Sequence, residues 1–343
     1  MRVFPVVCWA MVWVWLLPTH SWAQVTRVDV EVVESPALGG ERFGSVGQYE
    51  RLRGIVYAEV DPNDPRHRGI VNLDKAPIND RGHVEYSTTV EIYRPLDMSR
   101  WNHDVYHTVS NRGGSGAAEP ALLEMGLALV RVGWQGDLSP TETNIVPFLP
   151  IATNNDGSPI VGPALEEFIF NDAKTVSTGS LSYPAATLDP GEAKLTVRRN
   201  QSSPRLTPDG LSWKFADAEQ IQITRPDGFD GGAIYEFIYE ARDPIVMGLG
   251  FVAMRDVISF LRYEERDDVG HENPLAFEGL PTAALSLGIS QSGRVLRDFL
   301  YQGFNEDVSG RIVFDGIHPN IAGSRKTFTN YQFSQPGRWQ KQH

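Results

Sequence analysis

The stretch TAALSLGISQSGR at residues 282–294 joins an apolar segment to a serine that stands between small residues. The apolar residues 282–289 predict a buried strand, and the apolar spacing of residues 291–303 predicts a helix. A sharp turn from a strand into a helix needs small residues two places before and after its tip, and Gly288 and Ser292 occupy these places around Ser290. The stretch therefore predicts Ser290 at a strained strand-to-helix turn, a position typical of a nucleophile.

The sequence allows two alternatives to this interpretation of Ser290. If Ser292 were the nucleophile, bulky Arg294 would occupy the second tight position, so Ser290 is the better candidate. The usual motif has a glycine where this chain has Ser292. An ordinary strand–helix turn, in which serines cap the helix, also stays open.

Strands and helices alternate on both sides of this stretch, which predicts a mostly parallel sheet with flanking helices. The strands are expected at 104–110, 127–134, 282–289 and 310–314, and the helices at 117–125, 245–263 and 291–303. In contrast, residues 24–103 predict an N-terminal antiparallel β region, with strands at 25–33, 49–60, 69–73 and 83–93.

Residues 138–244 interrupt this alternation and are rich in Pro, Gly, Asn and Asp. A plain loop of this length would be unusual in a compact domain. Strands expected at 194–199 and 220–224 indicate an inserted subdomain or lid. The α/β domain of residues 104–343 would then carry this insert.

A second glycine-rich turn, NRGG at residues 111–114, follows the strand expected at 104–110. Ser115 also stands between small residues, but two residues separate the strand from the first glycine, so no sharp turn is expected there. Adjacent glycines allow backbone N–H groups to approach an oxyanion. We predict that the oxyanion donors come from the backbone N–H groups of Arg112, Gly113, Gly114 and Gln291. A glycine-rich turn with no chemical role is the alternative.

Residues 248–253, GLGFVA, fit a dinucleotide-binding pattern, but no strand runs into the first glycine. These small residues are expected to let the helix pack closely on the sheet. The histidines show no metal-ligand spacing, and Asp61 and Asn63 are typical of a turn. We therefore expect no metal and no cofactor.

The N-terminus predicts export. Arg2 precedes an apolar run at residues 4–17, and Ser21 and Ala23 stand at the −3 and −1 positions of a cleavage site. A signal peptide of residues 1–23, cleaved after Ala23, predicts a secreted or periplasmic protein, with an uncleaved anchor as the alternative. Cys8, the one cysteine of the sequence, lies in this segment, so the mature chain would have no disulfide.

The formal net charge is −12, from 31 Lys and Arg against 43 Asp and Glu, and there is no basic run. Such a surface repels nucleic acids and anionic membranes, so we exclude both as partners. A small-molecule or ester substrate is expected instead.

Several segments resemble a family of exported bacterial proteins known as alpha/beta hydrolase domain proteins. They are GISQSGRVLRDFLYQGFN at 288–305, GRIVFDGIHPNIAGS at 310–324, GQYERLRGIVYAEVDP at 47–62, NRGG at 111–114, GWQGDL at 133–138 and RDPIVMGLGFVAMRD at 242–256. The resemblance extends from about residue 25 to the last residue. It implies an α/β-hydrolase fold and a serine hydrolase whose nucleophile is Ser290.

In this fold the nucleophile is followed in sequence by an acid and then a histidine. Asp315, directly after the strand expected at 310–314, is the candidate acid, and a turn residue before Gly316 is the alternative. His318 is expected to order the same loop. One strand alone follows the turn at Ser290, so the chain is expected to be incomplete, with the catalytic histidine beyond residue 343.

The expected activity is carboxylic-ester hydrolysis through an acyl-enzyme on Ser290. A truncated, non-catalytic exported binding protein of the same fold is the alternative. A covalent serine probe distinguishes the two.

Overall fold

The computed structural model describes residues 24–114, 116, 118–229 and 231–336. The signal peptide expected at residues 1–23, its cleavage after Ala23, and the second serine motif at Ser115 lie outside these residues and stay predictions. In the described part of the chain, no helix is long and apolar enough to cross a membrane.

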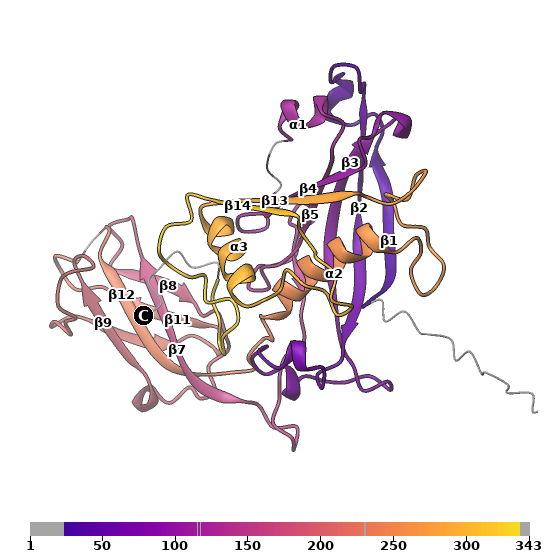
Figure 1. Ribbon diagram of the computed structural model, residues 1–343. Helices are drawn as coiled ribbons and strands as arrows, with labels where there is room; N and C mark the ends of the chain where they lie inside the picture. The colour runs from indigo at the N-terminus through magenta and orange to yellow at the C-terminus, as the bar shows by residue number, and fades with distance from the viewer. Residues whose placement is uncertain (1–23, 115, 117, 230, 337–343) are drawn as a thin grey trace, which may run out of the picture.

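An eight-stranded mixed sheet forms the centre of the molecule (Figure 1). Its strands are β1 (Val25–Glu34), β2 (Tyr49–Val60), β3 (Val84–Pro95), β4 (Asp104–Thr108), β5 (Ala128–Val132), β6 (Pro147–Phe148), β13 (Ala283–Ile289) and β14 (Gly316–Asn320). They follow the order β1-β2-β3-β5-β4-β13-β14, and β6 pairs with β3.

The four strands β5, β4, β13 and β14 are parallel to one another, whereas β1, β2 and β3 pair antiparallel. The antiparallel pairing of β3 with β5 joins the antiparallel part of the sheet to the parallel part. The sheet is therefore mixed, which corrects the mostly parallel sheet that we expected. The N-terminal strands are antiparallel as expected, but they extend the same sheet and do not precede it as a separate region.

Two α-helices cover one face of the sheet, α2 (Leu249–Tyr263) and α3 (Gln291–Tyr301). α1 (Pro120–Glu124) contributes Leu123 to a smaller apolar cluster with Tyr49, Tyr93 and Leu129. The short 3-10 helices are η1 (Leu38–Gly40), η2 (Pro65–His67), η3 (Leu73–Lys75), η4 (Met98–Arg100) and η5 (Pro190–Glu192).

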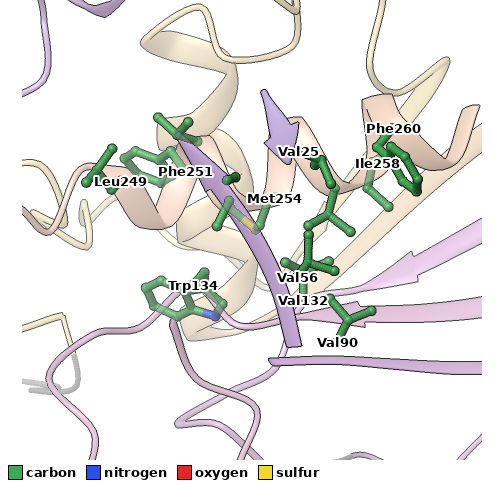
Figure 2. Packing of buried hydrophobic residues seen from close by; sticks show 14 of the residues in the cluster. Val25, Val56, Val90, Val132, Trp134, Leu249, Phe251, Met254, Ile258 and Phe260 are labelled. Carbon is green, nitrogen blue, oxygen red and sulfur yellow. The ribbon is translucent and has the colours of Figure 1, made fainter. Parts of the chain in front are cut away.

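The main core lies between α2 and the strands, where Phe251, Met254 and Ile258 pack towards Val56 and Val132 (Figure 2). Close packing depends on a glycine of the GLGFVA segment. A Cβ atom at Gly250 would lie 1.9 Å from the carbonyl oxygen of Trp134. The glycine thus lets this helix approach the segment that directly follows β5, and burial of the apolar side chains supplies the main stabilising free energy.

Residues 161–242 of the insert form two three-stranded antiparallel sheets that enclose a second apolar core. One sheet contains β7 (Val161–Ile169), β12 (Ile234–Arg242) and β9 (Lys194–Arg198), and the other contains β10 (Ser212–Phe215), β11 (Gln220–Thr224) and β8 (Val176–Ser180). Tyr235 and Phe237 of β12 are buried between them. The main-chain carbonyl of Ser334 accepts a hydrogen bond of 2.6 Å from Tyr183, so the C-terminal segment packs on the insert.

Two expected strands are absent from the fold. Residues 69–73 form turns that lead into η3, and residues 310–314 lie outside the sheet, whose last strand β14 starts at Gly316. Phe314 does not pair in a strand. Its apolar side chain packs in the core against His107 and Phe299. Pro319 within β14 is tolerated because, among the residues that the structure describes, this strand pairs with β13 alone and lies at the edge of the sheet.

Candidate active site

Ser290 lies at the junction of β13 and α3, one residue before the helix begins. Its backbone has φ 63° and ψ −112°. This region is disfavoured for residues with a side chain, and such conformations are retained where the surrounding structure enforces them. The structure therefore places Ser290 at the strained strand-to-helix turn that the sequence predicts, which we call the elbow.

Close backbone packing enforces this turn. A Cβ atom at Gly288 would lie 2.4 Å from the carbonyl oxygen of Ser292, so no other residue fits there without a shift of the backbone. The Ser292 hydroxyl group accepts a hydrogen bond of 2.8 Å from the Ile289 N–H and donates one of 2.9 Å to the Ile289 carbonyl. This bridge explains how a serine can replace the usual glycine, since its side chain holds the turn together.

The loop of residues 111–114 is tied to the elbow by Asn111. The Asn111 amide donates to the carbonyl of Ile289 at 3.0 Å and accepts from the Ser292 N–H at 2.9 Å. β4 and β13 are parallel neighbours, so both loops leave the same edge of the sheet. The two segments that we expected to form one site thus lie side by side.

The backbone of this loop is left-handed at Arg112 (φ 51°) and Gly113 (φ 70°). The N–H of Gly114 donates to the carbonyl of Asn111 at 3.1 Å, which engages it inside the turn. Gly114 is therefore not available as an oxyanion donor, and this part of the prediction needs correction. Gln291 is the first residue of α3, so its N–H has no acceptor within the helix.

A cavity of about 500 Å³ opens beside the elbow. Its walls include Asn111 and Ser292, together with the apolar side chains of Leu122, Leu129 and Ile289. Ile289 directly precedes Ser290 and is 40% exposed. Ser290 itself does not line the cavity, whose walls also include the charged residues Glu119 and Arg131, so the cavity reaches the elbow through its neighbours Ile289 and Ser292.

Asp315 lies at the opposite end of β13 from Ser290. Its carboxylate accepts from the Ala284 N–H at 2.8 Å and pairs with Arg262 at 2.9 Å. Ala284 and Ser290 are separated by almost the whole strand, about 20 Å at 3.3 Å per residue. The candidate acid of the sequence analysis is therefore wrong: Asp315 precedes β14 and cannot reach the elbow.

No histidine in the described part of the chain forms a hydrogen bond with Ser290. His318, expected in a loop, lies in β14 opposite Leu287 with an exposed side chain. His107 is fully buried, and its Nδ1 atom lies 2.8 Å from the Ser286 hydroxyl oxygen. Burial lowers the pKa of His107 to about 3, so the ring is neutral near pH 7.

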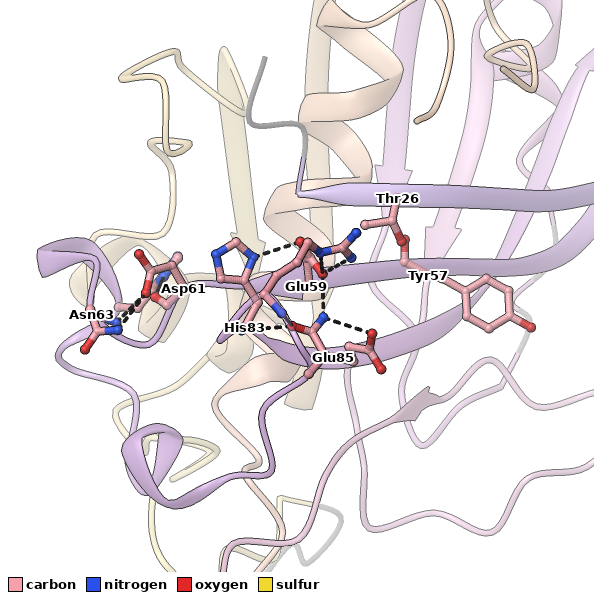
Figure 3. Close-up of polar contacts among 10 residues, drawn as sticks. Thr26, Tyr57, Glu59, Asp61, Asn63, His83 and Glu85 are labelled. Atoms are coloured by element: carbon pink, nitrogen blue, oxygen red, sulfur yellow. Dashed lines mark hydrogen bonds and ion pairs between the residues drawn. The ribbon is translucent and has the colours of Figure 1, made fainter. Parts of the chain in front are cut away.

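An acid–histidine pair that the sequence did not reveal joins Glu59 and His83 at 2.8 Å (Figure 3). Burial alone would raise the pKa of Glu59. Hydrogen bonds from His83, Arg81 and Asn79 have a larger combined effect, so the pKa of Glu59 is lowered. This pair belongs to the β2–β3 part of the sheet, and β5 and β4 separate β3 from β13. Among the residues with described positions, no group of three His, Cys, Asp or Glu side chains could hold a metal ion.

A family model described as an alpha/beta hydrolase domain matches residues 185–342, just under half of the chain. The matched region includes β12, α2, the elbow and β14. No curated protein matches the chain. Together, the match and the mixed sheet support a hydrolase-type fold.

Proposed function

We propose that this chain is a serine hydrolase that cleaves carboxylic esters through an acyl-enzyme on Ser290. The observation that carries the proposal is the backbone of Ser290, with φ 63° and ψ −112° between a strand and a helix. Such a conformation costs about 1–3 kcal/mol and is concentrated at functional sites. It projects the side chain of a nucleophile away from the strand that carries it.

In the first step, the Ser290 Oγ forms a bond to the acyl carbon, the bond to the leaving oxygen breaks, and the hydroxyl proton ends on the leaving alcohol. Water then attacks the acyl-enzyme, which releases the carboxylic acid and restores the Ser290 hydroxyl. The negative oxygen of each tetrahedral intermediate would be stabilised by the N–H of Gln291, at the positive end of α3, and by the N–H of Arg112 or Gly113.

The cavity beside the elbow supports a short acyl chain as the group transferred. Its volume of about 500 Å³ would hold a small ester, with Leu129, Leu287 and Ile289 as the apolar part of a wall that also contains Glu119 and Arg131. We also propose that the protein is exported, on the pattern of residues 1–23. Cell fractionation with N-terminal sequencing tests this: a chain that starts at Gln24 in the periplasmic or culture fraction is expected, and an intact Met1 in a soluble cytoplasmic fraction would reject export.

Hydrolysis of short p-nitrophenyl esters tests the enzymatic proposal. Ser290→Ala should reduce kcat/KM by at least about 10³-fold, because the nucleophile is removed. Ser180→Ala is the matched control, since Ser180 is an exposed serine at the end of β8 in the insert, and it should retain full activity. Equal rates in the wild type and Ser290→Ala, or no hydrolysis by the wild type, would reject the proposal.

A further inference from the structure

Three arginines stand on separate segments whose backbones meet at the elbow. Arg112 belongs to the loop that Asn111 ties to Ser292. Arg294 lies in the first turn of α3, and its N–H donates to the Ser290 carbonyl at 3.1 Å. Arg325 belongs to the segment after β14, and its carbonyl oxygen accepts a hydrogen bond from Arg297.

The segment after β14 is held against the first turn of α3. The Ser290 N–H donates to the carbonyl of Asn320 at 3.0 Å. A Cβ atom at Gly293 would lie 2.6 Å from the same carbonyl and 3.4 Å from the Cβ of Ala322. The Arg297 guanidinium also donates to the carbonyl of Gly323, so the backbone that carries Arg325 is fixed beside the helix.

These charges are not neutralised within the described part of the chain. None of Arg112, Arg294 and Arg325 forms an ion pair there, although other arginines of the protein pair repeatedly with carboxylates. Residues 316–343 contain no Asp or Glu. This positive cluster therefore stands out in a protein whose net charge is −12.

The positive charge of Arg294 is destabilised by its surroundings. Its Nε atom is buried without a hydrogen-bond partner among the described residues. Burial lowers the pKa of Arg294, and the like charges of Arg325, Arg112 and Arg297 lower it further, against a weaker opposite effect of Asp298. A half-buried cation beside other cations is unfavourable unless an anion binds among them.

We propose that Arg112, Arg294 and Arg325 bind a carboxylate group of the substrate, so that the ester cleaved at Ser290 is negatively charged. A half-ester of a dicarboxylic acid is the simplest member of this class. Guanidinium groups are well suited to carboxylates because they donate several hydrogen bonds in one plane. This inference rests on the proposed function, because it names the substrate class of the same site.

The kinetic test compares mono-p-nitrophenyl glutarate with p-nitrophenyl pentanoate, which has the same acyl length but no charge. The wild type should prefer the charged ester at least about 10-fold in kcat/KM at low salt, and 0.5 M NaCl should reduce this preference because salt screens charges. Arg294→Gln and Arg325→Gln should each lower the ratio of the two kcat/KM values by about 10-fold. Arg42→Gln is the control, because Arg42 is exposed and is distant in sequence from the three arginines. This variant should leave the ratio unchanged. An equal ratio in all four proteins would overturn the inference.

A binding test separates failure of this inference from failure of the proposed function. Glutarate binding is measured by isothermal titration calorimetry with the wild type, Arg325→Gln and Arg42→Gln. If neither ester is hydrolysed but glutarate binds more weakly to Arg325→Gln alone, the hydrolase proposal fails and the anion site stands. If glutarate does not bind, or binds equally to all three proteins, the anion site is rejected whatever the esterase activity.

Discussion

Asn111 accepts a hydrogen bond of 2.9 Å from the backbone N–H of Ser292, although 181 residues separate the two in the sequence. The same side chain donates to the carbonyl of Ile289 at 3.0 Å. Asn111 therefore spans the turn that contains Ser290 and fixes the position of the 111–114 loop relative to it. The position of the predicted oxyanion donors relative to the predicted nucleophile therefore depends on the Asn111 side chain.

Replacement of Asn111 by alanine should reduce esterase activity at least about 10-fold, because the oxyanion donors lose their position relative to Ser290. Loss of two hydrogen bonds should lower the free energy of unfolding by about 1–3 kcal/mol. The matched control is Asn63→Ala, in an exposed turn where the Asn63 amide donates to Asp61 alone. Steady-state kinetics and urea unfolding measure both effects. Wild-type kcat/KM in Asn111→Ala would contradict the positioning role.

Strain at Ser290 predicts that glycine at this position gives a more stable protein than alanine, although neither variant is active. Ser290→Gly should unfold with a free energy about 1 kcal/mol higher than Ser290→Ala, because glycine adopts a positive φ without steric cost. Both variants should lack esterase activity. Equilibrium unfolding in urea measures the difference, and an alanine variant as stable as the glycine variant would show that the turn is not strained.

Asp315→Asn should affect stability and leave catalysis almost unchanged. The side chain of Arg262, which is 5% exposed, loses its charged partner in this variant, so we expect a loss of about 1–2 kcal/mol. Esterase kcat/KM should stay within about twofold of the wild type, since the carboxylate lies at the far end of β13. A well-folded Asp315→Asn protein with a 100-fold lower kcat would restore Asp315 as the catalytic acid.

His107 should make the protein sensitive to acid. Burial, assisted by the charge of Arg131, lowers the pKa of His107 to about 3, whereas an unfolded histidine has a pKa near 6.5. Below pH 6.5 the unfolded state therefore gains a proton that the folded state does not, and stability falls by about 1.4 kcal/mol per pH unit down to about pH 3.

The comparison variant is His107→Gln, which keeps a polar partner for Ser286 but does not titrate. Between pH 7.5 and 4.5, the wild type should lose about 2–3 kcal/mol more unfolding free energy than His107→Gln. Urea unfolding at the two pH values measures this difference. Parallel losses in both proteins would show that His107 does not remain neutral in the folded state.

Local sequence predicted the elbow well, because its determinants are close together. The apolar run before Gly288 and the small residue at 292 are sufficient to predict the strand, the turn and the start of α3. The close approach of Gly288 to the Ser292 carbonyl shows that the spacing reflects a steric requirement.

The strand after the elbow is difficult to predict because its sequence is not typical of a strand. GIHPN, at Gly316–Asn320, contains a proline and polar residues, yet edge strands accept both. Val313 and Phe314 have the apolar character of a strand but are buried by helix packing. This shift of a few residues moved Asp315 from one end of the sheet to the other.

The insert and the arginine cluster depend on contacts that a single sequence does not reveal. In β12, Tyr235, Phe237 and Tyr239 are buried at every second position, but Glu236 between them is buried as well, so the strand lacks the plain apolar–polar alternation that predicts one. Arg112, Arg294 and Arg325 come from segments as much as 213 residues apart by their numbers. Their association follows from the order of the strands, which the sequence does not specify directly.

Covalent labelling with a fluorophosphonate, followed by mass spectrometry, tests the central claim most directly. The probe reacts with the activated hydroxyl of a serine nucleophile, so its site of attachment identifies that residue. We predict one adduct per chain, located on the peptide that contains Ser290, absent from Ser290→Ala and fully retained in Ser180→Ala. An unlabelled wild-type protein, or an adduct that persists in Ser290→Ala, would contradict the assignment of Ser290 as the nucleophile.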